Sequence, residues 1–498
     1  MQTAIQQLRD RGIGVARLVT DSRAVRPGDT FVAYPGERAD GRRFIAQAIA
    51  SGANAVIWES RHFAWDNVWR VPNVAVDDLR HQAGWLADDA YGSPSKELWL
   101  VGITGTNGKT SSAHWVAQGL NDAAKKCGVI GTLGNGFYGA LQPDPNTTPD
   151  AVRVHGLLAA YRDDGAIAAA MEVSSHALAQ GRVNGVHFDV ALFTNLSRDH
   201  LDYHGGMDSY AASKRKLFNW DGLRYAVLNL DDRFGIELAE QWRSETTELV
   251  GYGMSDFALQ FAERMGIRMV HGTVLEMSAQ GLHLAVHTSW GGAQLRSNLL
   301  GRFNAANLLG VLAVLLLSDV ALGDAVSSLG RVQAVAGRMQ RIGGQHQPTV
   351  VVDYAHTPDA LEKVLLALRE VNAESAGKLV CVFGCGGDRD RGKRAMMGMI
   401  AEKFSDQCIV TSDNPRNENP QQIIDDVVAG MNGDKHRIVP DRAAAIAQAI
   451  RMAQRQDTVL LAGKGHETYQ EICGVKHPFS DVAVARQALN GWRQEVSA

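Results

Sequence analysis

A glycine-rich segment between an apolar stretch and a helical pattern carries the clearest chemistry in the sequence. It runs Gly105-Thr-Asn-Gly-Lys109-Thr110 and follows the apolar residues 98–104. Backbone N–H groups at such a helix start bind phosphates, a lysine here can reach the β- and γ-phosphates, and a hydroxyl can bind Mg²⁺. Ile103 stands where the common phosphate-loop pattern has its first glycine. The segment predicts nucleotide binding without saying what the nucleotide drives.

Two further segments place acidic and histidine side chains at the ends of predicted strands. Glu172 closes the apolar stretch 167–173, and strand carboxyl ends face the ligand crevice of an open α/β sheet. Glu172 is therefore a candidate second ligand for Mg²⁺, although an exposed glutamate at a strand end explains the same pattern. After the next strand, residues 199–204 hold two aspartates and two histidines. Because Mg²⁺ prefers oxygen ligands, the histidines hint at a second metal position.

The five cysteines predict neither a disulfide framework nor a nucleophile. Their number is odd and small for 498 residues. Cys381 and Cys385 could suggest a metal site, but no second Cys/His pair at zinc spacing accompanies them. Residues 378–383 favour the other interpretation, a buried strand in which cysteine is a small hydrophobe. No Ser-His-Asp pattern is visible either.

Alternating strand-like and helix-like stretches must position these side chains, and they divide the chain into three domains. At roughly 150 residues per domain, 498 residues predict about three. Breaks at residues 92–95 and near Gly337 give a small N-terminal α/β domain (1–91), a central P-loop ATPase-like domain with a parallel sheet (92–337) and a C-terminal Rossmann-like α/β domain (338–498). The predicted strands are 29–34, 55–58, 74–76, 98–104, 167–173, 190–194, 225–229, 349–353, 379–383, 407–411 and 458–462. The predicted helices are 41–51, 77–91, 304–317, 359–371, 421–431 and 442–455.

Composition limits the classes of partner. Hydrophobic residues make up 45% and charged residues 21%, which is typical of globular proteins, and the net charge is -4. Such a charge gives no general reason to bind nucleic acid or membrane. No signal-peptide pattern is visible, and the longest apolar stretch, 308–317, is too short to span a membrane. We expect a cytoplasmic protein without nucleic-acid partner or membrane span, and, with no coiled-coil seam, a monomer.

Taken together, short motifs along the whole chain resemble the Mur ligases of peptidoglycan precursor synthesis. Eight occur in register: Gly105-Thr-Asn-Gly-Lys-Thr110, Asn146-Thr-Thr-Pro149, Glu172-Val-Ser-Ser-His176, Asn195-Leu-Ser-Arg-Asp-His-Leu-Asp202, Asp353-Tyr-Ala-His-Thr-Pro358, Gly384-Cys-Gly-Gly-Asp-Arg-Asp390, Asp413-Asn-Pro-Arg416 and Gly463-Lys-Gly-His-Glu467. No single motif is decisive, but their order leaves little room for coincidence.

The resemblance implies a reaction. ATP would phosphorylate the D-glutamate γ-carboxylate of UDP-N-acetylmuramoyl-L-alanyl-D-glutamate, and the amine of meso-2,6-diaminopimelate would attack the acyl phosphate to give an amide. A carboxylate is a poor electrophile, and phosphorylation supplies its leaving group. Lysine and Mg²⁺ would offset the repulsion between the two anions. We expect ATP and Mg²⁺, at two sites, as cofactors, and these three small molecules as the partners.

The resemblance also implies site residues. The residues implied for ATP are Gly105, Thr106, Asn107, Gly108, Lys109, Thr110, Ser111, Asn304, Asn307, Arg338, Asp353 and His356. Those implied for the UDP-linked substrate are Ser22, Asn146, Thr147, Thr148, Ser174, Gln180 and Arg182. Those implied for diaminopimelate are Arg389, Asp413, Asn414, Pro415, Arg416, Gly463 and Glu467. The implied catalytic residues are Lys109, Glu172, His200 and Lys214. For Asn304, helix N-capping is a second role that can hold beside adenine binding.

Lys214 is a surface lysine on chemistry alone, and only the resemblance gives it a role. In the family, the lysine at this position is carbamylated, which turns a cation into a carboxylate-like anion. The implied metal ligands are then Thr110, Glu172, His200 and carbamylated Lys214. Lys216 competes for this assignment, but the spacing from Tyr210 favours Lys214.

The choice of amino acid is predicted from one short loop. Diaminopimelate carries a carboxylate at its far end that lysine lacks, and a site that pairs with it rejects the analogue. Arg416 offers a guanidinium fork for that carboxylate, and Pro415 stiffens the loop. Glu467 is a candidate for the distal ammonium. A charged loop without a ligand is the plain alternative.

Four other functions are weighed against this one. A lysine-adding Mur ligase and a folylpolyglutamate synthetase share the chemistry but differ in substrate. A P-loop motor or switch would need partner-stimulated ATP hydrolysis, and no coupling region stands out. A non-catalytic nucleotide-binding module is disfavoured because Lys109, Thr110, Glu172 and His200 are all present.

Overall fold

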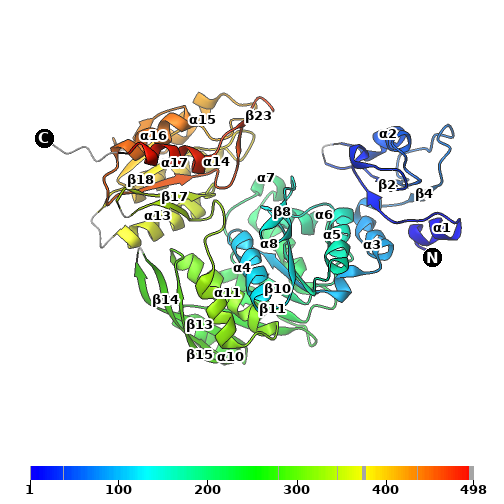
Figure 1. Cartoon of the computed structure of the whole chain (residues 1–498), viewed down its shortest axis with the longest axis horizontal. Helices are drawn as coiled ribbons and strands as arrows, with labels where there is room; N and C mark the ends of the chain where they lie inside the picture. The colour runs from blue at the N-terminus through cyan, green and yellow to red at the C-terminus, as the bar shows by residue number, and fades with distance from the viewer. Residues whose placement is uncertain are drawn as a thin grey trace.

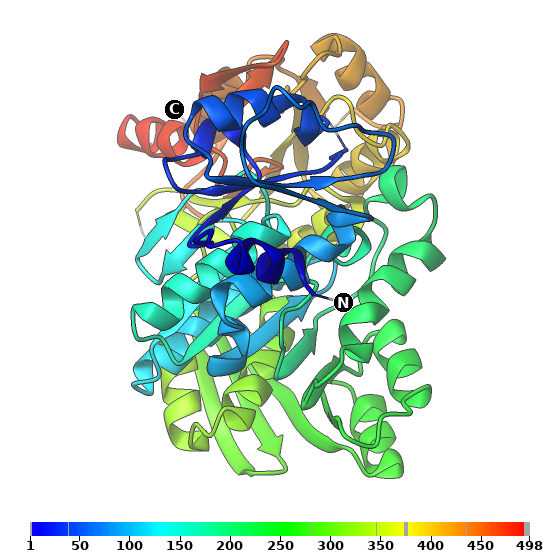
Figure 2. The same ribbon diagram turned by 90° about the vertical axis from the view of Figure 1, so that its right-hand side faces the viewer.

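The computed structural model describes residues 2–37, 39–278, 280–344, 346–372, 377–434 and 436–492. Within these residues, three large sheets follow one another along the chain, of four, eleven and six strands. The units built on the first and the last sheet both lie above the central unit in Figure 1. The N-terminal unit faces the viewer in Figure 2. The three sheets fall within the three predicted ranges, and the α/β class predicted from the sequence is confirmed.

The N-terminal unit is a parallel four-stranded sheet in the order β1-β2-β3-β4. Its strands and helices are α1 (Ala4–Asp10), β1 (Leu18–Val19), η1 (Ser22–Ala24), β2 (Thr30–Ala33), η2 (Gly41–Phe44), α2 (Ile45–Ala50), β3 (Ala55–Glu59), β4 (Asn73–Val76) and α3 (Leu79–Tyr91). The apolar core beneath β3 and α3 continues into the central unit, where it takes in Ala151 and Val152. Gly92, at φ 73°, ends α3.

The central sheet has a parallel middle and antiparallel edges. Its order is β15-β14-β13-β12-β11-β10-β5-β9-β6-β7-β8. The parallel strands are β5 (Trp99–Thr104), β6 (Cys127–Gly131), β9 (Ala168–Glu172), β10 (Val190–Phe193), β11 (Tyr225–Asn229), β12 (Glu248–Gly253) and β13 (Arg268–Ser278). The antiparallel additions are β7 (Gly134–Phe137), β8 (Ala140–Gln142), β14 (Gly281–Thr288) and β15 (Gly291–Ser297). The sequence did not predict these edge strands.

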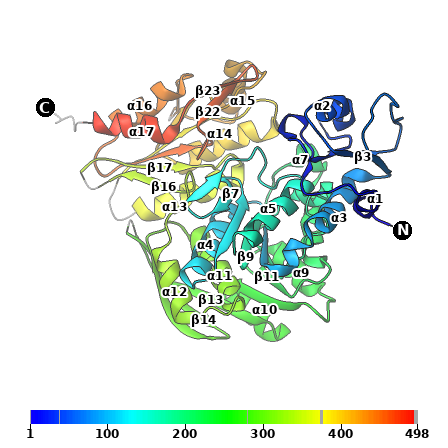
Figure 3. The same ribbon diagram turned by 45° about the vertical axis from the view of Figure 1, so that its right-hand side comes forward.

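Helices cover this sheet, and two buried clusters form its core. The helices are η3 (Pro94–Glu97), α4 (Lys109–Asp122), α5 (Ala151–Asp163), α6 (Ser175–Gln180), α7 (Leu201–His204), α8 (Met207–Arg215), η4 (Lys216–Asn219), α9 (Arg233–Glu240), α10 (Asp256–Met265), α11 (Arg302–Leu317) and α12 (Leu322–Arg331). The apolar helix α11 packs against α4, the helix that follows the phosphate loop. Figure 3 shows α4 beside α11 in the central unit, so the helix that begins at the phosphate loop (residues 105–110) is held within this unit.

One helix start differs from the prediction. We expected Asn304 as a possible N-cap, but α11 begins at Arg302, after Gly301. Gly301 has φ 87°, so this residue makes the turn into the helix. The Asn304 side chain is buried inside the first turn and donates to Leu300 O at 2.8 Å. The capping role predicted for Asn304 is therefore wrong.

The C-terminal unit contains a six-stranded sheet in the order β16-β17-β21-β18-β19-β20, parallel except for β16, and the antiparallel pair β22-β23. Its strands and helices are β16 (Gln340–Gly343), β17 (Thr349–Asp353), α13 (Pro358–Asn372), β18 (Leu379–Phe383), α14 (Gly392–Phe404), β19 (Gln407–Val410), α15 (Pro420–Val428), β20 (His436–Ile438), α16 (Arg442–Met452), β21 (Thr458–Ala462), β22 (Tyr469–Ile472), β23 (Val475–Pro478) and α17 (Asp481–Asn490). Cys381 lies buried in β18, so the predicted strand there is confirmed. Among the described residues, no helix is both long enough and apolar enough to span a bilayer.

Candidate functional site

The phosphate loop connects β5 to α4 in a backbone shape that needs glycine. Gly105 has φ 151°, and a Cβ there would lie 1.9 Å from Thr194 Oγ1. Gly108 has φ 89°, and a Cβ there would lie 2.5 Å from Asn307 Oδ1. Asn307, which lies on α11, therefore packs against the phosphate loop. This is one of the two asparagines predicted to bind on the adenine side. These close approaches explain why glycine stands at both positions.

The polar side chains of this loop face one another. Lys109 Nζ donates to Gly105 O and Thr106 O, both at 2.8 Å, and burial lowers the pKa of Lys109. Thr110 Oγ1 donates to Glu172 Oε2 at 3.0 Å. The predicted pair of Mg²⁺ ligands is therefore adjacent, with two kinds of oxygen donor.

Glu172 is held by a residue that the sequence did not single out. Its carboxylate is buried and accepts hydrogen bonds from Thr132 N at 2.7 Å and Thr132 Oγ1 at 3.1 Å. Thr132 Oγ1 also lies within hydrogen-bond distance of Thr147 Oγ1, at 3.1 Å. This short network connects the Mg²⁺ ligand pair to the threonines predicted to bind the UDP-linked substrate.

Lys214 lies directly beneath the phosphate loop. Its side chain is buried, and Nζ donates to Gly105 O at 2.8 Å and lies 4.5 Å from the centre of the Tyr210 ring. Burial, reinforced by the positive charge of Lys109, lowers the pKa of Lys214 well below its usual range. Lys216 instead points to Leu178 O at 3.5 Å. The two lysines, of which the sequence favoured Lys214, therefore have different surroundings.

His200 lies beside the same loop but is not part of a preformed metal cluster. Its Nε2 is 3.3 Å from Asp199 Oδ2, its backbone has φ 55°, and burial lowers its pKa to about 4. The rings of His176 and His200 meet edge to face with centroids 4.8 Å apart. In the described part of the chain, no three His, Cys, Asp or Glu side chains converge on a metal position. Residues 199–204, the segment dense in acidic and histidine side chains, therefore present aromatic rings and polar groups.

The C-terminal unit reaches the phosphate loop through a few side chains. Arg338 Nη2 is 3.4 Å from Thr110 Oγ1, and its guanidinium stacks over Tyr354 at 4.6 Å. Asp353 is buried, accepts from Met339 N at 2.7 Å, and has a pKa raised by burial. Asn107 Nδ2 approaches Asp359 Oδ2 at 3.5 Å. Arg338, which the resemblance assigns to the nucleotide, therefore faces the phosphate loop, and Asp353 lies behind it at Met339. Of the other residues predicted for ATP, Thr106 and Ser111 are buried in and beside the loop.

A cavity of about 990 Å³ is lined by residues of all three units. Most residues predicted for the other two substrates line it. They are Asn146, Thr147, Thr148, Ser174, Gln180, Arg182, Arg389, Asp413, Asn414, Arg416, Gly463 and Glu467. His200 and His356 line it as well, and Arg198 and Asp390 pair across it at 3.5 Å. The cavity therefore brings together residues separated by more than 300 positions in the sequence.

Two predicted substrate residues, Ser22 and Pro415, are not among the residues that line this cavity. Ser22 is buried in the N-terminal unit, where Oγ donates to Gln47 Oε1 at 3.0 Å, and it is not among the lining residues. The N-terminal unit contributes Glu37 instead, which accepts from Gln180 Nε2 at 2.7 Å and from Tyr203 Oη at 3.1 Å. Arg182 Nη1 donates to Thr148 O at 2.8 Å. Sequence reasoning missed Glu37, because nothing local connects it to Gln180.

At the amino-acid end of the cavity, two charged partners of predicted residues were also missed, Glu471 and Lys464. Arg416 Nη1 donates to Gly387 O at 2.7 Å, and Nε lies 3.3 Å from Glu471 Oε2. Glu467 Oε2 accepts from Lys464 Nζ at 2.9 Å and from Asn414 Nδ2 at 2.8 Å. Glu467, predicted for the distal ammonium, is thus already paired with a protein ammonium.

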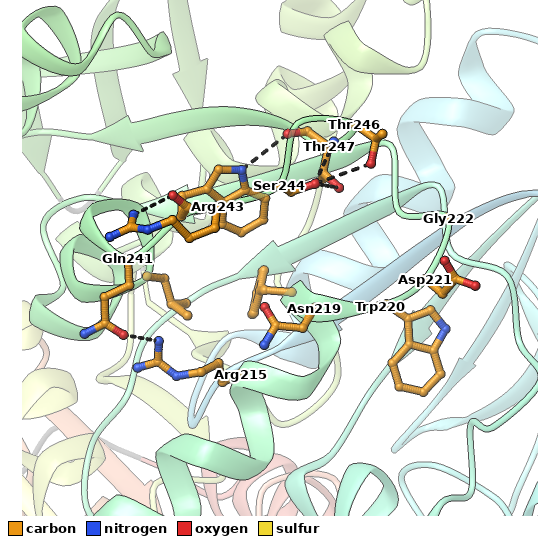
Figure 4. Close-up of a pocket in the computed structure, with 13 residues that line it drawn as sticks. Arg215, Asn219, Trp220, Asp221, Gly222, Gln241, Arg243, Ser244, Thr246 and Thr247 are labelled. Atoms are coloured by element: carbon orange, nitrogen blue, oxygen red, sulfur yellow. Dashed lines mark hydrogen bonds between the residues drawn. The ribbon is translucent and has the colours of Figure 1, made fainter.

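A second cavity, of about 540 Å³, lies on the central unit away from these residues (Figure 4). Two tryptophans, two arginines and several hydroxyl groups border it, and no predicted site residue does. The lining residues are Arg215, Phe218, Asn219, Trp220, Asp221, Gly222, Leu238, Gln241, Trp242, Arg243, Ser244, Thr246 and Thr247. The predicted chemistry belongs to the larger cavity.

Comparison with known proteins agrees with this geometry. Family models match in chain order: "Mur ligase family, catalytic domain" at residues 15–91, "Mur ligase middle domain" at 103–315 and "Mur ligase, glutamate ligase domain" at 337–465. The UDP-N-acetylmuramoyl-L-alanyl-D-glutamate–2,6-diaminopimelate ligase of Chromobacterium violaceum is 53% identical over 97% of this chain and 96% of its own. The same-named ligase of Nitrosomonas europaea is 51% identical over 97% of this chain and 94% of its own. A solved structure of a ligase with that name has 35% identity and a TM-score of 0.67, covering 98% of this chain and 99% of its own. The chain therefore belongs to the Mur ligase family.

Proposed function

We propose that this chain joins meso-2,6-diaminopimelate to the D-glutamate γ-carboxylate of UDP-N-acetylmuramoyl-L-alanyl-D-glutamate, using ATP. The observation that carries the proposal is one cavity lined both by Asp413, Asn414 and Arg416 and by residues 146–148. Thr147 is connected to the phosphate loop through Thr132 and Glu172. Relatives about half identical over nearly the whole chain bear the name of this ligase. The proposal implies that the same cavity holds the acceptor carboxylate and the incoming amine.

ATP and Mg²⁺ are the proposed cofactors. Thr110 and Glu172 offer hydroxyl and carboxylate oxygens 3.0 Å apart, a donor set that suits Mg²⁺. When bound there, Mg²⁺ would neutralise charge on the transferring phosphoryl group. Lys109 binds the phosphates and Arg338 faces Thr110 from the C-terminal unit, so the phosphate loop is cationic from both sides.

The protein's part in the reaction is positioning. The γ-carboxylate oxygen attacks the γ-phosphorus and ADP leaves. The amine of the amino acid then attacks the acyl carbon, the C–N bond forms, and the C–O bond to phosphate breaks. No covalent enzyme intermediate is needed, which agrees with burial of Cys381 and Cys385. Holding the reactants in one cavity away from water replaces encounters in solution.

The proposal has a direct test. The purified chain is incubated with ATP, Mg²⁺ and the UDP-linked dipeptide, and phosphate release is compared with diaminopimelate or lysine as the amine. We expect release with diaminopimelate at least 10³-fold faster than with lysine at equal concentration, on the order of the discrimination given by a paired polar group. Equal rates would favour a lysine-adding or unselective ligase, and no release with either amine would contradict the ligase proposal.

Lys214 is proposed to carry a carbamate that serves the second metal position beside His200. Neutral amine adds to CO₂ to give R–NH–COO⁻ and a proton, and a buried lysine favours the neutral amine. We expect Lys214→Met to lower kcat about 10- to 100-fold, as losses around metal sites do. Lys216→Met is the matched control and should retain activity.

A spectroscopic measurement separates the carbamate from a plain structural lysine. Wild-type protein equilibrated with ¹³C-bicarbonate should show a carbamate carbon resonance that Lys216→Met keeps and Lys214→Met loses. A resonance that survives Lys214→Met, or its absence from the wild type, would refute the modification.

A further inference from the structure

Two strands of the C-terminal sheet end at the cavity and lead into the residues proposed to bind the amino acid. β19 ends at Val410, shortly before Asp413 and Asn414, and β21 ends at Ala462, directly before Gly463. A Cβ on Gly463, which has φ 113°, would lie 2.5 Å from Asp413 Oδ2. The two loops therefore touch, and their separation determines the shape of this end of the cavity.

A fully buried ion pair lies behind both loops. Arg442, the first residue of α16, and Asp481, the first residue of α17, each have 0% of the side chain exposed. Arg442 Nε and Nη2 donate to the two oxygens of Asp481 at 2.8 and 2.7 Å. This bidentate geometry fixes the plane of the guanidinium.

The same guanidinium also reaches both strand ends. Nη2 donates to Ala462 O at 3.0 Å, and Nη1 lies 3.5 Å from Ser412 O. These carbonyls belong to the residues immediately before Gly463 and Asp413. One rigid, planar group thus connects the last peptide of β21 to the loop after β19.

Stability alone is a poor reason for such a pair. Moving two charges out of water costs several kcal/mol per ion, and well-packed apolar residues often stabilise as well or better. What the ion pair provides, and an apolar pair would not, is directed hydrogen bonds to two carbonyls at the edge of the cavity.

We propose that Arg442 and Asp481 are positioning residues that set the spacing of the two loops holding the amino-acid substrate. The inference deepens the proposed function and rests on the assignment of Asp413, Asn414 and Gly463 to that substrate. Neither Arg442 nor Asp481 lines the cavity, so both act through the loops they hold.

The pair also acts on the charge of Asp413. Burial raises the pKa of Asp413, the positive charges of Arg442 and Lys464 oppose this rise, and the negative charges of Glu467 and Asp481 add to it. Tyr354 and Cys385 face Asp413 too, but burial raises each pKa to about 12, so both stay neutral. Arg442 therefore favours the carboxylate form of Asp413, the form that attracts an ammonium.

The main test removes the pair without leaving a buried charge. We expect Arg442→Met/Asp481→Leu to fold, and to raise KM for diaminopimelate about 10- to 100-fold, as small misplacements of binding groups do. KM for ATP and for the UDP-linked dipeptide should stay within about twofold of wild type. The control is Arg369→Met/Asp406→Leu, which removes a bidentate pair at the opposite end of the same sheet. An unchanged KM for diaminopimelate in the folded double variant overturns the proposal.

A pH profile supplies a readout that a purely structural pair would not move. In the double variant, loss of the Arg442 charge raises the pKa of Asp413 and loss of the Asp481 charge lowers it. The effect of Arg442 is the larger, so the acidic limb of kcat/KM for diaminopimelate should shift to higher pH. Asp481→Asn leaves Arg442 one amide oxygen as acceptor and removes a negative charge, so the limb should shift to lower pH. This variant keeps the proposal testable if the double variant fails to fold, and an unmoved limb in Asp481→Asn counts against it.

Asp413→Asn separates this inference from the function on which it rests. We expect this variant to raise KM for diaminopimelate. If it does not, the assignment of the amino-acid site is wrong. If it does, while Arg442→Met/Asp481→Leu leaves KM unchanged, the site assignment stands and the positioning role fails.

Discussion

Replacing Lys109 by alanine is expected to lower kcat on the order of 10³-fold, about 4 kcal/mol of transition-state stabilisation. The ammonium contacts two carbonyls of the phosphate loop, with Nζ 2.8 Å from both Gly105 O and Thr106 O. Phosphate oxygens are charged acceptors and bind an ammonium more strongly than these carbonyls do. Phosphoryl transfer should therefore suffer far more than binding of the other two substrates.

The loss should not come from unfolding. Burial lowers the pKa of Lys109, which means that its charged form is poorly solvated, so alanine removes an unfavourable burial together with two hydrogen bonds. We expect Tm within a few degrees of wild type, measured beside single-turnover conversion of ATP to ADP. Lys363→Ala, at a half-exposed pair with Asp359, is the control. If kcat of Lys109→Ala stayed within tenfold of wild type, the proposed role of Lys109 in phosphoryl transfer would be wrong.

Local sequence patterns were enough to predict the functional residues that lie at the ends of buried strands. Glu172 and the phosphate loop follow buried apolar strands, and parallel strands put their carboxyl ends on one edge, so their meeting could be predicted. Lys214 could be chosen over Lys216 only by resemblance, and three-dimensional geometry then gave a physical reason: one is buried under Gly105 and the other is not.

Residues that act through tertiary contacts left no local signal. Thr132 meets Glu172 across 40 positions, and Glu37 meets Gln180 across 143. The pair of Arg442 and Asp481 is 39 positions apart on two different helices. The antiparallel edges of the central sheet were missed for a similar reason. Their half-exposed strands alternate polar with apolar residues. They therefore lack the continuous apolar run from which the buried strands were predicted.

Arg416→Ala is expected to lower discrimination between diaminopimelate and lysine by about 10²- to 10³-fold, mainly through a higher KM for diaminopimelate. The guanidinium is held from two sides, by Gly387 O at 2.7 Å and Glu471 Oε2 at 3.3 Å. Its backbone, at φ 51°, is fixed by hydrogen bonds from Arg416 N to Glu471 O and from Cys473 N to Arg416 O. Such preorganisation lets a planar fork meet a carboxylate at little entropic cost.

The prediction depends on charge and shape together, and two variants separate them. Arg416→Lys keeps the charge but loses the fork, so it should recover only part of the selectivity. Glu471→Gln leaves Arg416 without its anionic neighbour, so the guanidinium should attract the substrate carboxylate more strongly, and KM for diaminopimelate should not rise. The surface control is Arg437→Ala, because Arg437 is exposed on β20. If Arg416→Ala left the ratio of kcat/KM for the two amino acids unchanged, selectivity would have to reside elsewhere in the cavity, and Arg389, the other arginine predicted for this substrate, would be the next residue to replace.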